Sequence, residues 1–412
     1  MEPVAPPERP ARGLLAPGIF VALAVVVANA LNAVFQVALA RILDPPEYSL
    51  LLALVVITLI AAVPPLAFQA AVAREVAVAL AEERPGNAGA ALRDTVRGLV
   101  PWALGILGLG GLAYPLLRAV GRGDAGATLA TAATIGAALV IPAVWGGLQG
   151  ARLFLFLGLA HLTFAGTRLA AGLGIGLAGG DAADVMAGVA GATAITLGLT
   201  LLPLRDLWRA AARSGARRLA TLPNAAAATG LTLLTALPSV DVLVAKLAFS
   251  PSTAGAYGVA SVGARVQLLV PIGVTTVLFP RVAVLRDRAR ERRHLLAGLS
   301  VVAVVGAGTT ALLWGLAGPL VRGVFGHKYA AAVPWLGPLS LAMALYALAT
   351  VYMYHFLSLA RARFALVLVG VFAVQLVLFG LLHARPAELI GVQIGVAAFC
   401  LACAEAWHLW RH

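Results

Sequence analysis

Long apolar stretches separated by short polar segments make up almost the whole chain. Twelve of them are about twenty residues long, which is the length that a helix needs to cross a bilayer. Lipid offers no partner to free backbone groups, so each stretch is expected to be helical. The expected spans are residues 14–40, 49–73, 99–117, 127–148, 154–178, 185–204, 225–247, 255–279, 295–318, 333–357, 364–383 and 388–410. The pattern predicts an all-α polytopic membrane protein.

The composition agrees with this class. Hydrophobic residues make up 61% of the 412, charged residues 11%, and the mean hydropathy is +0.95. Soluble domains carry about 25% charged residues, so this chain cannot cover a water-facing surface. The net charge of +13 would otherwise suggest a nucleic-acid partner, but Lys and Arg lie in short loops between spans. We therefore expect the lipid bilayer, and no nucleic acid, as a partner.

The distribution of Lys and Arg predicts the orientation. If the N-terminus is cytoplasmic, the inner segments carry 21 of these residues and the outer loops carry 6. The richest loops, 205–218 and 281–293, both fall inside. Because basic loops stay in the cytoplasm, both termini are predicted to be cytoplasmic. The first span is too long for a signal-peptide core, so it is expected to remain uncleaved.

The first two spans of each half look alike. Pro64 lies ten residues before Arg74, and Pro271 lies ten residues before Arg281. Six spans per half bring both copies in from the same side, which predicts a parallel pseudo-two-fold repeat with the substrate path between the lobes. Chance similarity between Ala/Leu-rich helices is the alternative. The expected organisation is a cytoplasmic tail (1–13), a six-helix N-lobe (14–204), a basic cytoplasmic linker (205–224) and a six-helix C-lobe (225–412).

Polar side chains form stripes on three of the spans. Asn29, Asn32 and Gln36 are spaced three and four apart, so they share one helical face. Such stripes must face protein or water, either as helix–helix hydrogen bonds or as the lining of a hydrated cavity. We favour the cavity because the stripes fall on corresponding helices of the two halves. The other stripes consist of Thr232, Thr235, Ser239 and Lys246 on span 7, and Thr58, Pro65 and Gln69 on span 2.

Charged residues within the spans indicate the kind of passenger. An Arg at the centre of a spanning helix costs roughly 2.5–3.5 kcal/mol on insertion scales. Arg168 and Arg265 lie near the middle of spans 5 and 8, one in each half, and Lys246 lies toward the outer end of span 7. Asp241 offers one carboxylate, which could pair with Arg265 as a structural ion pair. The remaining positive surplus suits an anion such as a phosphate ester, which Arg binds with two parallel hydrogen bonds.

Two further features bear on ion coupling and catalysis. His161 lies seven residues before Arg168 on the same face, so His161 and Asp241 are candidates for coupling transport to an ion. Cys400 and Cys403 lie inside the last span and are expected to be packing residues. We find no metal-ligand spacing, no nucleophile with a base nearby and no phosphate loop. The sequence therefore predicts no enzyme, no metal site and no cofactor.

Two blocks resemble a known family. "NAVFQVALARILDPPEYSLL" (32–51) is similar to the first hairpin of bacterial polysaccharide-unit flippases, and residues 240–283 resemble the hairpin that opens their second half. The family belongs to the multidrug/oligosaccharidyl-lipid/polysaccharide exporter (MOP) superfamily. The resemblance covers about 90 residues, and elsewhere only hydropathy and helix number agree.

The resemblance implies two lobes around a V-shaped cavity in the bacterial cytoplasmic membrane. It implies alternating access that moves an undecaprenyl-pyrophosphate-linked oligosaccharide to the outer leaflet, with other polysaccharide-assembly membrane proteins as further partners. Arg265 and Lys246, which lie in a matching block, become candidate pyrophosphate contacts. Arg168 lies outside both blocks, so its role rests on charge alone.

Two other functions compete. A cation-coupled multidrug exporter of the same superfamily needs a carboxylate within the membrane in its first lobe, and spans 1–6 offer none near their middle. A membrane glycosyltransferase, polymerase or ligase could use Asp44 and Glu47 as an acidic pair. Such enzymes resemble proteins with long outer loops, whereas the expected outer loops here are short.

Prolines within the second span of each lobe suggest a moving part. A proline inside a helix removes a hydrogen bond and kinks the helix. We interpret Pro64, Pro65 and Pro271 as hinges that swing Arg74 and Arg281 together at the cytoplasmic mouth. The alternative is inherited packing with no role in motion.

Overall fold

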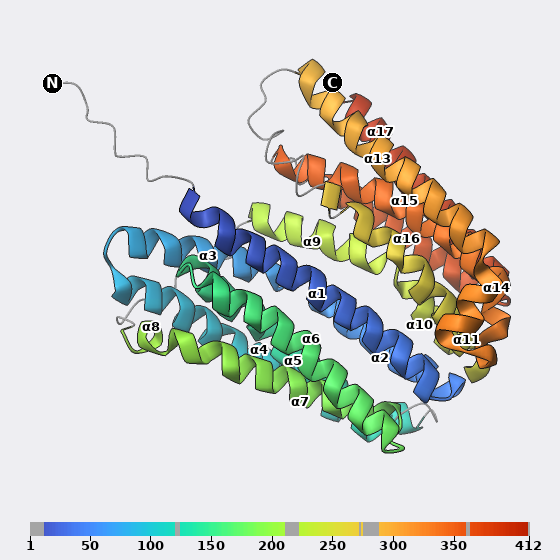
Figure 1. Cartoon of the computed structure of the whole chain (residues 1–412), viewed down its shortest axis with the longest axis horizontal. Coiled ribbons are helices and arrows are strands. Elements are labelled where there is room, and N and C mark those ends of the chain that lie inside the picture. Colours follow the sequence, from blue (N-terminus) through green and yellow to red (C-terminus); the bar gives the residue numbers. More distant parts are fainter. Residues whose placement is uncertain are drawn as a thin grey trace.

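The helices form two lobes. The computed structural model describes residues 12–119, 124–210, 222–271, 273–274, 288–359 and 363–410. Figure 1 shows one lobe coloured blue to green and the other coloured yellow to red. The N-lobe consists of α1 (Arg12–Ile42), α2 (Pro45–Ala61), α3 (Leu66–Ala81), α4 (Pro85–Ala119), α5 (Ala125–Gly150), α6 (Phe154–Leu177), α7 (Ala182–Leu201), η1 (Leu202–Leu204) and α8 (Arg205–Arg209). The C-lobe consists of α9 (Leu222–Ala236), α10 (Val240–Ala248), α11 (Pro251–Ala264), η2 (Arg265–Leu269), α13 (Arg288–Gly315), α14 (Ala317–Leu320), η3 (Val321–Phe325), η4 (His327–Ala332), α15 (Val333–Ser358), α16 (Phe364–Leu381) and α17 (Pro386–Trp410).

The membrane spans follow the hydropathy pattern. Among the described residues, ten helical segments are long and apolar enough to cross a membrane, and the bent pair α9–α10 makes an eleventh. Each of the eleven overlaps a predicted span. The one remaining predicted span, 255–279, begins as α11 and η2 and ends outside the described residues. The prediction of an all-α polytopic membrane protein in two lobes is confirmed.

The helix contacts repeat from one lobe to the other. In the N-lobe α1 packs on α6, α3 on α5, α4 on α5, α5 on α7 and α6 on α7. In the C-lobe α9 packs on α16, α11 on α15, α13 on α15, α15 on α17 and α16 on α17. Each pair in the second set follows its counterpart by six spans, as a parallel repeat requires.

Prolines interrupt the spans that connect the lobes. The second span breaks between Ala61 and Leu66, where Pro64 and Pro65 cannot donate backbone hydrogen bonds. In the C-lobe the helix tightens to a 3₁₀ segment, η2, before Pro271, whose missing N–H removes a bond to the carbonyl of Gln267.

A third break lies where a continuous span was expected. Residues 225–247 were predicted as one helix, but α9 and α10 meet at an angle of 45°. Pro238 stands in the three-residue gap between them. A proline in mid-helix costs an i to i−4 hydrogen bond, so the same rule that was applied to Pro65 also explains this break.

The lobes meet mainly through one half of a span. Residues of α2 such as Tyr48 and Leu52 share one buried apolar core with α10, α11 and α15 of the C-lobe. Residues of α3 such as Val72 and Val76 belong to a separate core with α4 and α5. The break at Pro64 and Pro65 thus divides the span into α2, which packs on α10 and α11 of the C-lobe as well as on α5 and α7, and α3, which packs mainly on α4 and α5 of the N-lobe.

The contact between the lobes lies toward one end of the molecule. We call this end, where α1 finishes and α2 begins, the outer end, because the predicted orientation places it outside. A β-carbon at Gly255 of α11 would collide with the carbonyl oxygen of Pro45, which shows how closely the two helix ends approach. Toward the opposite end, where α1 begins, the ribbons of the two lobes diverge (Figure 1).

Candidate functional site

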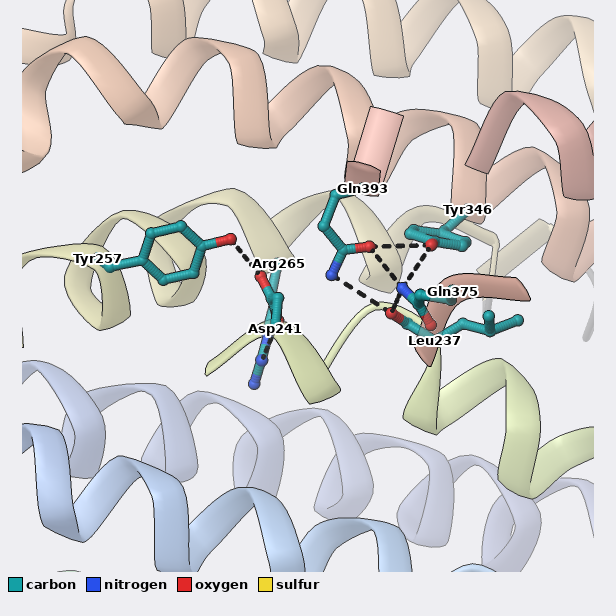
Figure 2. A network of polar contacts seen from close by, with 7 residues as sticks. All are labelled: Leu237, Asp241, Tyr257, Arg265, Tyr346, Gln375 and Gln393. Carbon is teal, nitrogen blue, oxygen red and sulfur yellow. Dashed lines mark hydrogen bonds and ion pairs between the residues drawn. The ribbon is translucent and has the colours of Figure 1, made fainter. Parts of the chain in front are cut away.

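A buried ion pair joins α10 to the start of η2, on the side of the C-lobe that faces the N-lobe (Figure 2). Asp241 on α10 is fully buried, and its Oδ2 accepts a 2.9 Å hydrogen bond from the hydroxyl of Tyr257 on α11. The Arg265 Nη2 lies 3.9 Å from Asp241 Oδ1, and the Arg265 side chain is 16% exposed. The structural pairing that the sequence left open is therefore present.

Arg265 keeps hydrogen-bonding capacity in this arrangement. Its Nε and Nη2 atoms are buried and have no hydrogen-bond partner among the described residues, since 3.9 Å is too long for one. It also lies within electrostatic range of Tyr48 on α2, so it stands at the side of the C-lobe that meets the N-lobe. An oxyanion that reached this interface would find two unused N–H donors.

An amide network lies beside the ion pair and was not predicted (Figure 2). Gln375 on α16 donates to the carbonyl of Leu237 at 2.9 Å, and Gln393 on α17 donates to the same oxygen at 3.3 Å. Gln393 Oε1 in turn accepts from Tyr346 at 2.9 Å and from Gln375 at 3.0 Å. The two amides thus satisfy a carbonyl beside the break at Pro238, as membrane helices require. The sequence could have indicated these residues, because Gln375 and Gln393 are amides that interrupt apolar spans, as Asn29 does.

Arg168 has neutral partners in the N-lobe. Its Nη1 lies 3.5 Å from Asn32 Oδ1 on α1, and its guanidinium lies 4.4 Å from the centre of the Phe35 ring. A cation over an aromatic face is attracted by the ring quadrupole. Among the described residues no ion pair involves Arg168, so its charge is uncompensated.

Lys246 also engages a neutral group. Its Nζ donates a 2.8 Å hydrogen bond to the hydroxyl of Ser49 on α2 and thereby crosses between the lobes. The Glu47 carboxylate also lies within electrostatic range of Lys246. Of the three predicted intramembrane cations, Arg265 is the one that has an ion-pair partner among the described residues.

The polar stripes are placed less uniformly than predicted. Asn29 is exposed, Gln36 is half-buried, and Gln69 lies 3.4 Å from the amide of Gln149. Thr235 donates to the Leu231 carbonyl of its own helix, a local bond that needs no cavity. These remain candidate cavity residues by position. Ser239 is buried at the start of α10, and the centre of the His161 ring lies 4.2 Å from that of Trp145, with the two rings tilted by 54°.

The residues proposed for the hinge and mouth are partly described. Pro64 is exposed and Pro65 is buried at the break, while Pro271 is buried just after η2. Arg74 is exposed on α3. Arg281 lies outside the described residues.

The acidic turn between the first two spans has a structural role. Glu47 Oε2 accepts a 3.0 Å hydrogen bond from the backbone N–H of Ala182, the first residue of α7. A carboxylate at a helix N-terminus satisfies a free donor and complements the helix dipole. Glu47 therefore stabilises the N-lobe. In the described part of the chain, no three His, Cys, Asp or Glu side chains gather as a metal site would require.

Comparison with solved structures identifies the fold. An inward-facing multidrug resistance MATE family transporter of the MOP superfamily superposes with a TM-score of 0.73 at 13% identity, covering 93% of each chain. The lipid II flippase MurJ in an inward closed conformation gives 0.68 at 13% identity, covering 94% of this chain and 86% of that one. An outward-facing MATE family transporter gives 0.64 at 14% identity, covering 96% and 94%. No protein-family model and no curated protein sequence matches the chain. The chain therefore shares its fold with these MATE family transporters and with the lipid II flippase MurJ.

Proposed function

We propose that the protein is a flippase of the bacterial cytoplasmic membrane. It moves an undecaprenyl-pyrophosphate-linked oligosaccharide from the inner to the outer leaflet, by alternating access, for surface polysaccharide biosynthesis. The observation that carries this proposal is the positive charge within the spans. Arg168 and Lys246 have neutral partners, and Arg265 keeps two unused donors. An anionic headgroup would compensate these charges.

The arrangement suggests how a pyrophosphate would be held. Arg265 would turn its free Nε and Nη2 toward phosphate oxygens, which accept bidentate bonds from a guanidinium. Lys246 would supply a point charge nearby on α10. The division of the second span at Pro64 and Pro65 offers a hinge between α2, which contacts both lobes, and α3, which packs mainly within the N-lobe.

The orientation follows from the loop charges and gains support from the shape. The lobes meet at the end that the charge distribution places outside. The superposition is better with the inward-facing MATE family transporter than with the outward-facing one. Both agree with cytoplasmic termini and with a molecule that receives its passenger from the inner leaflet.

A cation-coupled multidrug exporter is the second candidate. It is favoured by the similarity to multidrug resistance transporters and by the buried carboxylate of Asp241. The proximity of Arg265 to that carboxylate weighs against it, because a cationic drug would have to displace a built-in guanidinium.

Reconstitution separates the two candidates. The wild-type protein in liposomes should expose lipid-linked oligosaccharide to a glycan-binding probe on the opposite face, and should not accumulate a cationic dye under a sodium or proton gradient. Dye transport without flipping would replace the first candidate by the second. Protein-free liposomes and liposomes with an unrelated membrane protein provide the baseline.

A further inference from the structure

Two cations connect the outer ends of the lobes, because each donates hydrogen bonds to backbone carbonyls of the opposite lobe. Arg41, at the end of α1, donates from Nε to the carbonyl of Val324 at 2.7 Å, and from Nη2 to the carbonyl of Gly323. Lys328, on η4 of the other lobe, donates to the carbonyls of Arg41 at 3.0 Å and Leu43 at 2.6 Å. Each lobe thus supplies a cation to a helix end of the other lobe, where carbonyls lack helical partners.

A third cation makes an equivalent bond deeper in the contact. Lys246 donates to Ser49 across the same interface. We call Arg41, Lys246 and Lys328 the outer latch. The carboxylates of Asp44 and Glu47 interact electrostatically with Lys328 and Lys246. In the described residues, however, every direct bond of the latch goes to a neutral oxygen.

The latch is continuous with the buried pair of the C-lobe. Arg265 lies within electrostatic range of Tyr48. The Tyr48 ring meets that of Tyr329 edge-on at 5.9 Å, and Tyr329 directly follows Lys328. Lys246 lies five residues beyond Asp241 toward the outer end of α10. Arg265, Lys246 and Lys328 therefore all lie near the N-terminal part of α2, where the two lobes meet.

We propose that the outer latch is an anion-operated gate. Bonds between a cation and an anionic oxygen are shorter and roughly twice as strong as bonds with a neutral partner. Phosphate oxygens arriving from Arg265 would therefore displace the carbonyl and hydroxyl acceptors of the latch. Each displacement removes a bond between the lobes, so binding of the anion favours separation at the outer end. The proposal rests on the proposed function in assuming that the passenger carries phosphate.

The gate can be observed as a distance between the lobes. Pro46 and Ser252 are exposed near the starts of α2 and α11, and each can carry a spin label in a Cys400→Ala/Cys403→Ala background. Electron–electron resonance on the purified full chain should give mainly a short distance. Inorganic pyrophosphate should raise the population of longer distances at least about threefold, because it binds the separated state better. Sodium chloride at equal ionic strength should have no such effect.

Variants test whether the latch residues are responsible. Arg41→Ala/Lys328→Ala should populate the longer distances without pyrophosphate and respond to it little. Arg322→Ala is the matched control, because Arg322 is an exposed cation on η3 for which the described residues show no bond across the lobes. It should behave as the wild type does.

Several results would overturn the gate. The proposal is wrong if pyrophosphate does not change the distance distribution of the wild type, or if sodium chloride changes it equally. Neither result depends on how a variant folds. The proposal is also wrong if a well-folded Arg41→Ala/Lys328→Ala protein stays closed. The flipping assay separates this inference from the proposed function. A pyrophosphate-responsive gate in a protein that flips no lipid-linked oligosaccharide would retain the gate and refute the flippase, and flipping with an unresponsive gate would do the reverse.

Discussion

Arg168 in the N-lobe and Arg265 in the C-lobe occupy comparable places in the sequence but differ in their surroundings. Each is an arginine near the middle of an apolar span. Arg168 lies between the amide of Asn32 and the ring of Phe35. Arg265 faces the buried carboxylate of Asp241, which is itself held by Tyr257.

The comparison shows that two arginines at similar positions in apolar spans can be stabilised in different ways. Around Arg265 a counter-charge offsets the cost of burial, so the pair depends on both members. Around Arg168 polar and aromatic groups stabilise the ion while its net charge remains. The two lobes therefore contribute differently to an anion site, the first through uncompensated charge and the second through a charge that can exchange its partner.

The strongest test of this comparison is the replacement of Arg265 by Ala. It leaves a buried carboxylate without a counter-charge, so we expect a loss of about 3 kcal/mol in the free energy of unfolding. Flipping of lipid-linked oligosaccharide should fall at least about tenfold, as expected for loss of a hydrogen-bonded charge. Arg265→Lys should restore part of the flipping, because the charge survives and the bidentate geometry is lost. Detergent melting curves and the liposome assay provide the two measurements.

A double variant separates stability from transport. Arg265→Gln/Asp241→Asn removes both charges, so it should recover most of the lost stability while flipping remains low. If the double variant flips at the wild-type rate, Arg265 serves only the structure and not the passenger.

Replacement of Arg168 by Ala should affect transport more than stability. No carboxylate is left behind, so the free energy of unfolding should change by less than about 1–2 kcal/mol, the size of a cation–π contact. Flipping should nevertheless fall several-fold, because a compensating charge for the anion is lost. A large loss of stability with normal flipping per folded molecule would make Arg168 a structural residue.

The smallest effect is expected from the amide network of the C-lobe. Gln375→Leu frees part of the Leu237 carbonyl beside the break, which should cost about 1–2 kcal/mol in unfolding. Flipping should stay within about twofold of the wild type if the network only stabilises the break. Gln69→Leu in the N-lobe, where the bond to Gln149 is long and exposed, should change stability less. If Gln375→Leu and Gln69→Leu lower the free energy of unfolding equally, the amide network stabilises the C-lobe no more than Gln69 stabilises the N-lobe.

Several features could be predicted without the structure because their causes are local. Spans need about twenty apolar residues, and Pro64, Pro65 and Pro271 interrupt helices through their own missing N–H groups. Pro238 obeys the same rule, and its break could have been predicted. The amides of Gln375 and Gln393 likewise stand out in their spans.

The sequence by itself therefore determined the membrane class, the two-lobe repeat and the positions of charge along each span, since these depend on neighbours along the chain. The tertiary structure decided which partner each charge has. Asn32 lies 136 residues from Arg168, and Val324 lies 283 residues from Arg41. Hydrogen bonds act over about 3 Å, so only the packing of helices distant in sequence could bring these atoms together. For that reason Arg41 and Lys328, which in the sequence are two loop cations among several, become the bond between the lobes.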